Sequence, residues 1–471
     1  MTPNRRLHQG PAGEWWRPDL TMEVDERSGP AATAPPVSGV TFWALMGFSF
    51  VALVAPQEFF PVLAPLRIAL LAAAAAVITY LWDRLVHRQP VTVLTREIWI
   101  TAGLVGWAIV TVPLSYWPGG SVDFLLSFYF KSLVIFWLLA NTVMTLTRLY
   151  QVAWGLSLMA APVATTAVAH FVAGDFLPAS PRLAVTRIVG YDAPLTGNPN
   201  DLALMLNLIL PLSVALLLAT RRPPLRAVLL GLVGLDVVAV ILTFSRGGFL
   251  TLATVLFVYL WKIRRRPERR WAWAALLVVL VACVPLLPSR YVDRVSTITS
   301  LKSDTTGSAQ LRWDDTVAAA RFVLANPVVG AGVGMNVLAL IQERGDNRWT
   351  AVHNVYLEYA VELGLPGLVL FLLLLGGCFR SVRFVQRRSV AVPALRDLFL
   401  LAEGLQVSLV AFTVAALFHP VAYHLYFYYF AALALTVKTV YAAETGCAPE
   451  LFTLPVAEPE PHGGIAQLRE A

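Results

Sequence analysis

Long apolar runs, separated by short polar segments, dominate the chain. A run of roughly 17–25 apolar residues crosses a bilayer as a helix, because a helix satisfies its own backbone hydrogen bonds in lipid. On this criterion we place about twelve such helices. They lie at residues 40–55, 66–82, 97–114, 128–146, 149–172, 201–219, 226–244, 247–262, 271–288, 362–379, 397–418 and 424–441. Segment 118–130 is a candidate interfacial helix that leads into the fourth span.

Composition agrees with this pattern. Of the 471 residues, 57% are hydrophobic and 14% are charged, whereas about a quarter of a soluble domain is charged. The mean hydropathy is +0.66. The three cysteines are far apart in sequence and suggest neither a disulfide framework nor a metal site. The sequence therefore predicts an all-α integral membrane protein.

The basic residues predict how the helices are oriented. Most of them lie in alternate loops, and segment 114–130 on the other side has no Lys or Arg. The basic loops contain Arg84, Arg88, Arg96, Arg148, Arg221, Arg222, Arg226, the run 262–270, Arg380, Arg383, Arg387, Arg388 and Arg396. By the positive-inside rule these loops are cytoplasmic. The net charge of +7 then reflects topology, and we expect no nucleic-acid partner.

An even number of spans places both termini in the cytoplasm of a multi-pass protein of the cytoplasmic (inner) membrane. The expected organisation has five parts. They are a disordered cytoplasmic tail at 1–39, nine helices at 40–288, an extracytoplasmic loop domain at 289–354, three helices at 355–441 and a disordered cytoplasmic tail at 442–471. Within the large loop, helical spacing predicts a helix at 308–324 that ends at Asn326-Pro327. Gly330, Gly332 and Gly334 then predict a flexible connector.

The turn Thr243–Gly248 is a candidate anion site between two spans. Arg246 lies there at the outer membrane edge, where the positive-inside rule disfavours a basic residue. The glycines Gly247 and Gly248 allow a ligand to approach the backbone closely. The alternative is an arginine that snorkels from a helix end to the interface.

A second candidate anion site precedes the sixth span. Arg182 and Arg187 lie upstream of the segment Gly197–Asn200, and Asn200 or Asp201 is the candidate cap of a helix that begins on the outer side. A helix N-terminus with arginines nearby attracts anions. An ordinary capped loop explains the same residues equally well.

The large loop supplies the remaining candidates. Arg312 opens its predicted helix. Asp314 and Asp315 are adjacent, so they point to different helix faces and make a poor metal pair; local ion pairing is the interpretation we favour. His353 and Asn354 stand at the end of the loop, where a histidine can exchange a proton near neutral pH. A lone histidine is often structural, and His170, His419 and His424 have the same ambiguity in weaker contexts.

Four motifs in this order resemble the O-antigen ligase and O-antigen polymerase family of bacterial membrane glycosyltransferases. They are Arg187-Ile-Val-Gly with Gly197-Asn-Pro-Asn200, Phe244-Ser-Arg-Gly-Gly248, Arg312-Trp with 326–334, and His353-Asn-Val-Tyr-Leu-Glu-Tyr-Ala-Val-Glu-Leu-Gly-Leu-Pro-Gly367. The resemblance is strongest over residues 187–370, and the last motif is the most specific. It implies a GT-C-like fold in which the active site faces the periplasmic or extracytoplasmic side.

The resemblance also implies a reaction. Family members move a glycan from an undecaprenyl-pyrophosphate carrier to an acceptor, which is lipid A-core for a ligase and another carrier-linked glycan for a polymerase. Carried over by motif, Arg187, Arg246 and Arg312 hold the pyrophosphate, and His353 acts on the acceptor hydroxyl. Asn354, Tyr356 and Glu358 are further candidate substrate contacts, with Glu358 as an orienting partner of His353.

These residues suit a metal-independent enzyme without a cofactor. Departure of a lipid pyrophosphate needs positive charge where negative charge develops, and guanidinium groups provide it in a fork that matches phosphate oxygens. The expected partners are the lipid-linked glycan donor, the acceptor and membrane lipids. The alternative hypotheses are a polymerase, a transporter of lipid-linked sugars and a non-catalytic scaffold. A transporter would instead place its polar residues near the bilayer midplane.

Overall fold

The computed structural model describes residues 38–176, 195–265 and 308–446, together with the single positions Ile188, Gly190, Tyr191, Ala193 and Ala274. Over these residues the protein is all helical and contains no β-strand. The helices are α1 (Gly39–Val54), α2 (Pro56–Phe59), α3 (Ile68–Val86), α4 (Arg96–Thr111), α5 (Pro118–Phe124), α6 (Phe130–Thr142), α7 (Leu146–Ala173), α8 (Pro199–Ala219), α9 (Pro223–Leu242), α10 (Arg246–Arg264), α13 (Ser308–Ala325), α14 (Asn336–Arg344), α15 (Val355–Ser389), α16 (Arg396–Ala415) and α17 (Leu425–Thr445). The prediction of an all-α integral membrane protein is confirmed.

Among the described residues, 10 helical segments are long and apolar enough to cross a membrane. The first predicted span is α1, which is apolar but has 16 residues, and the predicted span 271–288 lies outside the described residues except for Ala274. The total of about twelve helices therefore stays a prediction. The predicted interfacial segment 118–130 is instead the start of one continuous span, Pro118–Thr142, in which a π-helical turn joins α5 to α6.

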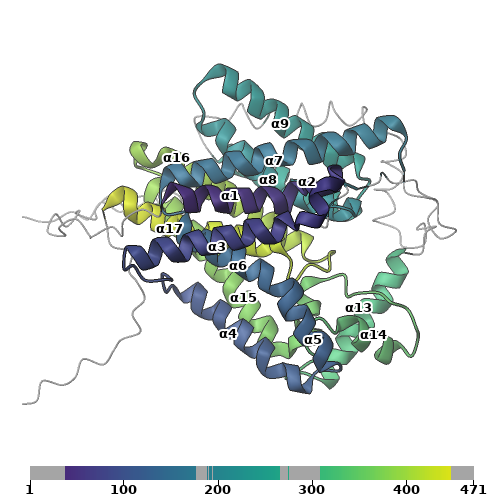
Figure 1. Cartoon of the computed structure of the whole chain (residues 1–471). Coiled ribbons are helices and arrows are strands. Elements are labelled where there is room, and N and C mark those ends of the chain that lie inside the picture. The colour runs from purple at the N-terminus through teal and green to yellow at the C-terminus, as the bar shows by residue number, and fades with distance from the viewer. Residues whose placement is uncertain are drawn as a thin grey trace, which may run out of the picture.

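The spans form a bundle (Figure 1), whose two ends carry different polar contacts. At one end, Arg84 donates a hydrogen bond to the carbonyl oxygen of Asn141 (3.0 Å), and Arg396 donates one to that of Leu218 (2.7 Å). These contacts join loops that the sequence assigned to the same side. α8, α16 and α17 are the most buried spans, while α3 and α9 expose most of their surface. The first group therefore forms the interior of the bundle.

At the opposite end, α13 and α14 form a lobe outside the bundle (Figure 1). α13 covers the predicted helix 308–324 and ends just before Asn326, so that prediction is confirmed. Short α14 had no strong signal in the sequence. The lobe has a small apolar core of its own, formed by Ala318, Ala319, Phe322, Ala331, Met335, Ala339, Leu340, Val352 and Val361. Since Val361 belongs to α15, the lobe packs directly on the start of that helix.

The segment between α13 and α14 is an ordered strap, so the prediction of a flexible connector is wrong. Ala331 donates its backbone N–H to the carbonyl oxygen of Val361 (2.8 Å), and Gly334 donates its own to the Glu362 carboxylate (2.7 Å). Gly332 has φ +96°, and a Cβ there would come within 2.9 Å of the Ser115 Cα. The glycines are needed for close approach and left-handed backbone, and the hydrogen bonds hold the strap in place.

α15 is two helices joined at a kink. Gly364 has φ 65° and ψ −173°, which interrupts the helical backbone. The next residue, Leu365, donates its N–H to the carbonyl oxygen of Pro327 in the strap (2.8 Å). The predicted span 362–379 therefore begins earlier and ends later than the sequence suggested, because its first two turns pack against the lobe before the helix continues into the bundle.

Candidate functional site

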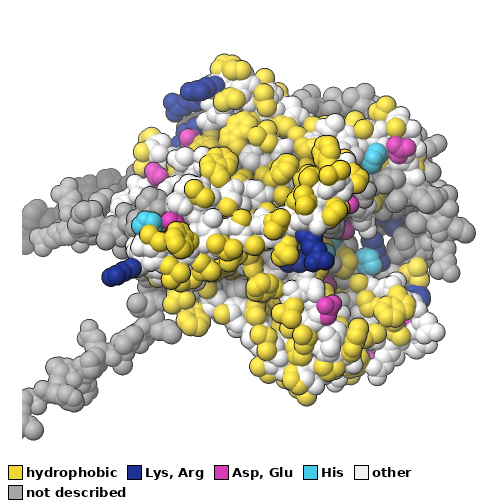
Figure 2. All heavy atoms as spheres, in the orientation of Figure 1, with side chains coloured by type: hydrophobic (Ala, Val, Ile, Leu, Met, Phe, Trp, Pro, Cys, Tyr) yellow, Lys and Arg dark blue, Asp and Glu magenta, His cyan; other side chains and the backbone are white. Residues whose placement is uncertain are grey.

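Polar side chains collect where the lobe meets the end of the bundle. The elements that meet there are α13, the segment before α15, the turn before α10, the N-terminus of α8 and the loop between α16 and α17. In Figure 2, histidine and basic side chains are visible in a recess between the bundle and the lobe. Arg246, Arg312 and His353 come from three of these elements.

His353 is held as a neutral ring. Its Nδ1 lies 2.9 Å from the carbonyl oxygen of Ala351, and since a carbonyl only accepts, Nδ1 carries the proton. Burial and the positive charge of Arg312 together lower the pKa of His353 to about 4. The ring is therefore neutral at pH 7, and the lone pair on Nε2 can accept a proton.

A chain of hydrogen bonds fixes the position of His353. The preceding residue, Val352, donates its N–H to the side-chain oxygen of Asn336 (3.1 Å), and the backbone N–H of Asn336 donates to the buried Glu362 carboxylate (3.1 Å). On the other side, Val355 donates its N–H to the carbonyl oxygen of Ala416 (2.8 Å). The segment around His353 is thus anchored both to the start of α14 and to the loop after α16.

Arg312 lies in the first turns of α13 and is half-buried. Its positive charge contributes to lowering the pKa of His353. The neighbouring Asp315 forms a buried ion pair with Arg344 of α14 (2.5 Å), and Asp314 accepts a hydrogen bond from Gln310 (3.0 Å). The prediction of local ion pairs is therefore wrong in both cases: the partner of Asp315 lies 29 positions away, and the partner of Asp314 is an uncharged glutamine.

Arg246 is the first residue of α10, in the predicted hairpin turn. Ser245 caps the helix by accepting the backbone N–H of Gly248 (3.1 Å), and it donates its hydroxyl proton to the side-chain oxygen of Asn200 (2.8 Å). This contact fixes the start of α10 against the start of α8. A Cβ on Gly248 would lie 2.7 Å from the Cβ of Ala203, so this glycine serves helix packing rather than ligand approach.

His419 belongs to the same cluster, although its sequence context was weaker than that of His353. It is buried, with Nδ1 2.9 Å from the carbonyl oxygen of Ala415 and Nε2 3.3 Å from that of Asn200. A Cβ on Gly247 would lie 3.2 Å from the ring. His419 also contributes to lowering the pKa of His353. It therefore joins the α16–α17 loop to the starts of α8 and α10. The one signal in the sequence was a histidine-proline pair at the end of an apolar run.

The other predicted contacts have structural partners. Asn354 caps α15 by accepting the backbone N–H groups of Tyr356 (2.9 Å) and Leu357 (3.1 Å). The Tyr356 hydroxyl donates to the carbonyl oxygen of Thr413 (2.9 Å). Buried Glu358 accepts the backbone N–H of Ala422 (3.1 Å), so its recorded hydrogen bond fixes the α16–α17 loop and does not involve His353.

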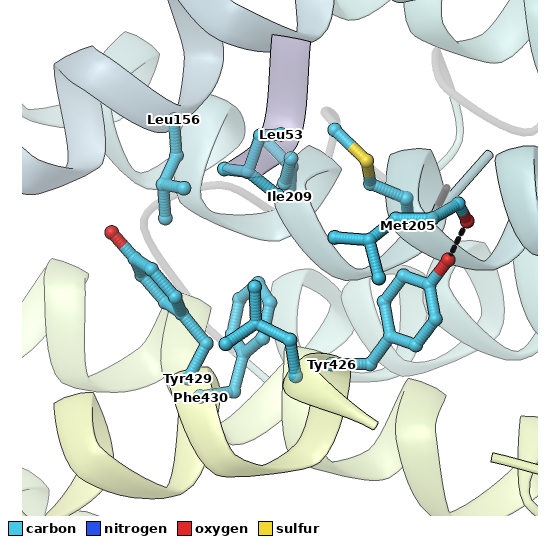
Figure 3. Close-up of a pocket in the computed structure, with 9 residues that line it drawn as sticks. Leu53, Leu156, Met205, Ile209, Tyr426, Tyr429 and Phe430 are labelled. Carbon is cyan, nitrogen blue, oxygen red and sulfur yellow. Dashed lines mark hydrogen bonds between the residues drawn. The ribbon is translucent and has the colours of Figure 1, made fainter. Parts of the chain in front are cut away.

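Two further observations limit the site. Arg187 lies outside the described residues, and the described residues contain no group of three or more side chains suited to hold a metal ion. A cavity of about 20 Å³ lies inside the bundle between α1, α7, α8 and α17 (Figure 3). Its lining is apolar, and the one hydrogen bond drawn there runs from the Tyr426 hydroxyl to the carbonyl oxygen of Leu195. It is not the chemical site.

The fold defines a multi-pass membrane protein, and its candidate site is basic, contains histidine and lies beside the helical lobe. Residues 227–372 match the family model described as O-antigen ligase. The match contains Arg246, Arg312 and His353 and confirms the resemblance to the O-antigen ligase family seen in the motifs. No curated protein matches the chain. The family match supports a membrane function of the O-antigen ligase or polymerase type.

Proposed function

We propose that the chain is a metal-independent glycosyltransferase of the O-antigen ligase type. It transfers a glycan from an undecaprenyl-pyrophosphate carrier to lipid A-core or another glycan acceptor at the outer face of the cytoplasmic membrane. The observation that supports this proposal is that the segments bearing Arg246, Arg312 and His353 lie at one end of the bundle, opposite the basic loops. The positive-inside rule assigns the basic end to the cytoplasm.

In this proposal the arginines bind the pyrophosphate. Each guanidinium donates two parallel hydrogen bonds to phosphate oxygens and stays charged at any working pH. Arg246 and Arg312 approach from the bundle and from the lobe, respectively, so they hold the anion between them, with Arg187 as a third donor. As the sugar leaves, negative charge grows on the pyrophosphate, and these preorganised cations stabilise it.

His353 acts on the acceptor. Its Nε2 takes the proton of the acceptor hydroxyl while that oxygen attacks the anomeric carbon of the donor sugar. A new glycosidic C–O bond forms, and the C–O bond between that carbon and the pyrophosphate breaks with both electrons remaining on the leaving oxygen. The neutral ring described above is the form that this step needs.

A polymerase would use the same site with a second carrier-linked glycan as acceptor. The arrangement does not favour a transporter, because the candidate residues lie at helix ends and in loops, whereas transporters bind substrate near the midplane. We favour the ligase over the polymerase because the matching family model is described as O-antigen ligase.

The pH dependence of transfer tests this assignment. Because burial and Arg312 lower the pKa of His353 to about 4, kcat/KM should stay level down to about pH 5 and fall below it, as His353 becomes protonated. Arg312→Gln removes a positive charge, so the pKa rises toward its ordinary value of about 6.5 and the acid limb moves to higher pH. Measuring glycan transfer by the purified chain from pH 4 to 9 locates the pH at which kcat/KM falls.

The matched control is Arg321→Gln, which removes an exposed charge from the same helix. In this variant kcat/KM should fall at the same acidic pH as in wild type. An unchanged limb in Arg312→Gln would remove His353 as the titrating base, and no detectable transfer by wild-type protein would contradict the proposed function itself.

A further inference from the structure

An open basic pocket lies at the opposite end of the bundle from the proposed active site. Its volume is about 730 Å³. The lining comes almost entirely from the second half of α15, with one residue from α16: Gly376, Phe379, Arg380, Arg383, Phe384, Arg387, Arg388 and Val410. The arginines recur at helical spacing, so they project along one side of α15.

These arginines have no anionic partner in the described part of the chain. Arg383 and Arg388 lie over the rings of Phe379 (5.8 Å) and Phe384 (5.5 Å), and these are their recorded contacts. Lys262 at the same end, by contrast, lies 3.4 Å from a Glu403 oxygen. Topology alone requires only that positive charge be near the cytoplasm. It does not require a group of uncompensated guanidinium groups around one pocket.

Along the membrane normal, the pocket is apolar at its membrane-embedded end and basic at its cytoplasmic end. Gly376 and Val410 lie inside membrane-spanning helices, whereas Arg387 and Arg388 occupy the last turn of α15. From Leu365 to Ser389 the helix has 25 residues, which is about 37 Å at 1.5 Å per residue. A hydrocarbon core is about 30 Å thick, so the last turns reach the headgroup layer.

From this geometry we infer that the pocket binds the headgroup of an anionic phospholipid of the cytoplasmic leaflet. The phosphodiester accepts hydrogen bonds from the guanidinium groups, and an acyl chain lies along Phe379 and the apolar base of the pocket. Basic pockets between helices on this side of a membrane recognise anionic headgroups. A soluble anion would use the arginines but leave the aromatic and aliphatic base exposed.

Lipid binding to the purified full-length chain tests the inference. Phosphatidylglycerol, phosphatidylcholine or inorganic phosphate is added in neutral detergent, and binding is followed by the rise in melting temperature and by native mass spectrometry. We expect wild type to prefer phosphatidylglycerol over phosphatidylcholine. Arg380→Gln/Arg383→Gln/Arg387→Gln should bind phosphatidylglycerol roughly tenfold or more weakly. The single variant Arg383→Gln should show the same effect in smaller size.

The control is Arg221→Gln/Arg222→Gln/Arg226→Gln, which removes as many exposed charges from the same end outside the pocket. It should retain the preference, and a loss equal to that of the pocket variant would overturn the inference. If inorganic phosphate raised the melting temperature of wild type as much as phosphatidylglycerol does, the pocket would be a simple anion site instead. Binding that emerges only after deletion of 447–471, which contains Glu450, Glu458, Glu460 and Glu470, would make that tail the occupant.

Discussion

His353→Ala is expected to slow glycan transfer by about a hundred- to ten-thousand-fold, the usual contribution of general acid–base catalysis. Donor affinity should stay near the wild-type value, because the arginines, and not the imidazole, bind the pyrophosphate. The reason is the state of the ring: Nδ1 donates to Ala351, which leaves Nε2 as the proton acceptor. Transfer rate and lipid-donor binding are measured on the same membranes.

Two variants separate this role from a structural one. His353→Gln retains a hydrogen-bond donor for the Ala351 carbonyl but no basic nitrogen, so it should be nearly as slow as His353→Ala. A near wild-type rate in the glutamine variant would end the general-base role. Loss of donor binding in both variants would place His353 in the pyrophosphate site. His87→Ala, a histidine at the opposite end of the bundle bonded to Asp83, should transfer normally.

Arg246→Lys and Arg312→Lys are expected to lose about ten- to a hundredfold in kcat/KM while inserting and folding like wild type. Lysine retains the charge but not the planar fork. A charge-assisted hydrogen bond contributes about 1.5–3 kcal/mol, and each 1.4 kcal/mol corresponds to a factor of ten. We compare kcat/KM for transfer and the melting temperature of each purified variant with those of wild type.

Each lysine variant has a control on its own helix. Arg264→Lys lies at the other end of α10 from Arg246, and Arg321→Lys lies farther along α13 from Arg312; both controls change exposed side chains. They should transfer at the wild-type rate. If Arg246→Lys and Arg312→Lys also kept that rate, positive charge alone would suffice and bidentate pyrophosphate contact would be wrong.

Much of this fold was predictable because its signals are local. The apolar runs predict the described spans, and the short polar break between two of these runs predicts the turn before α10. The helical spacing in the loop and the stop at Asn326-Pro327 predict α13. Each of these features depends on residues within one or two helical turns of one another, so the local sequence is enough to predict it.

Contacts between distant segments were not predictable. His419 and Asn200 are 219 positions apart, and Gly334 and the Glu362 carboxylate are 28 apart. The glycines of the strap suggested flexibility because their sequence does not show the hydrogen bonds that hold them. Glu358 lies one turn into α15, and nothing local indicates that its carboxylate is buried against the α16–α17 loop.

Transfer by the purified protein in EDTA is the most direct test of the central claim. The chain is reconstituted with an undecaprenyl-pyrophosphate-linked glycan and lipid A-core, and the glycan-bearing product is measured over time. The proposed arginine and histidine site predicts product at an undiminished rate in EDTA and almost none with His353→Ala. Loss of product in EDTA with recovery on addition of Mg²⁺ or Mn²⁺, or equal product from His353→Ala, would contradict the account.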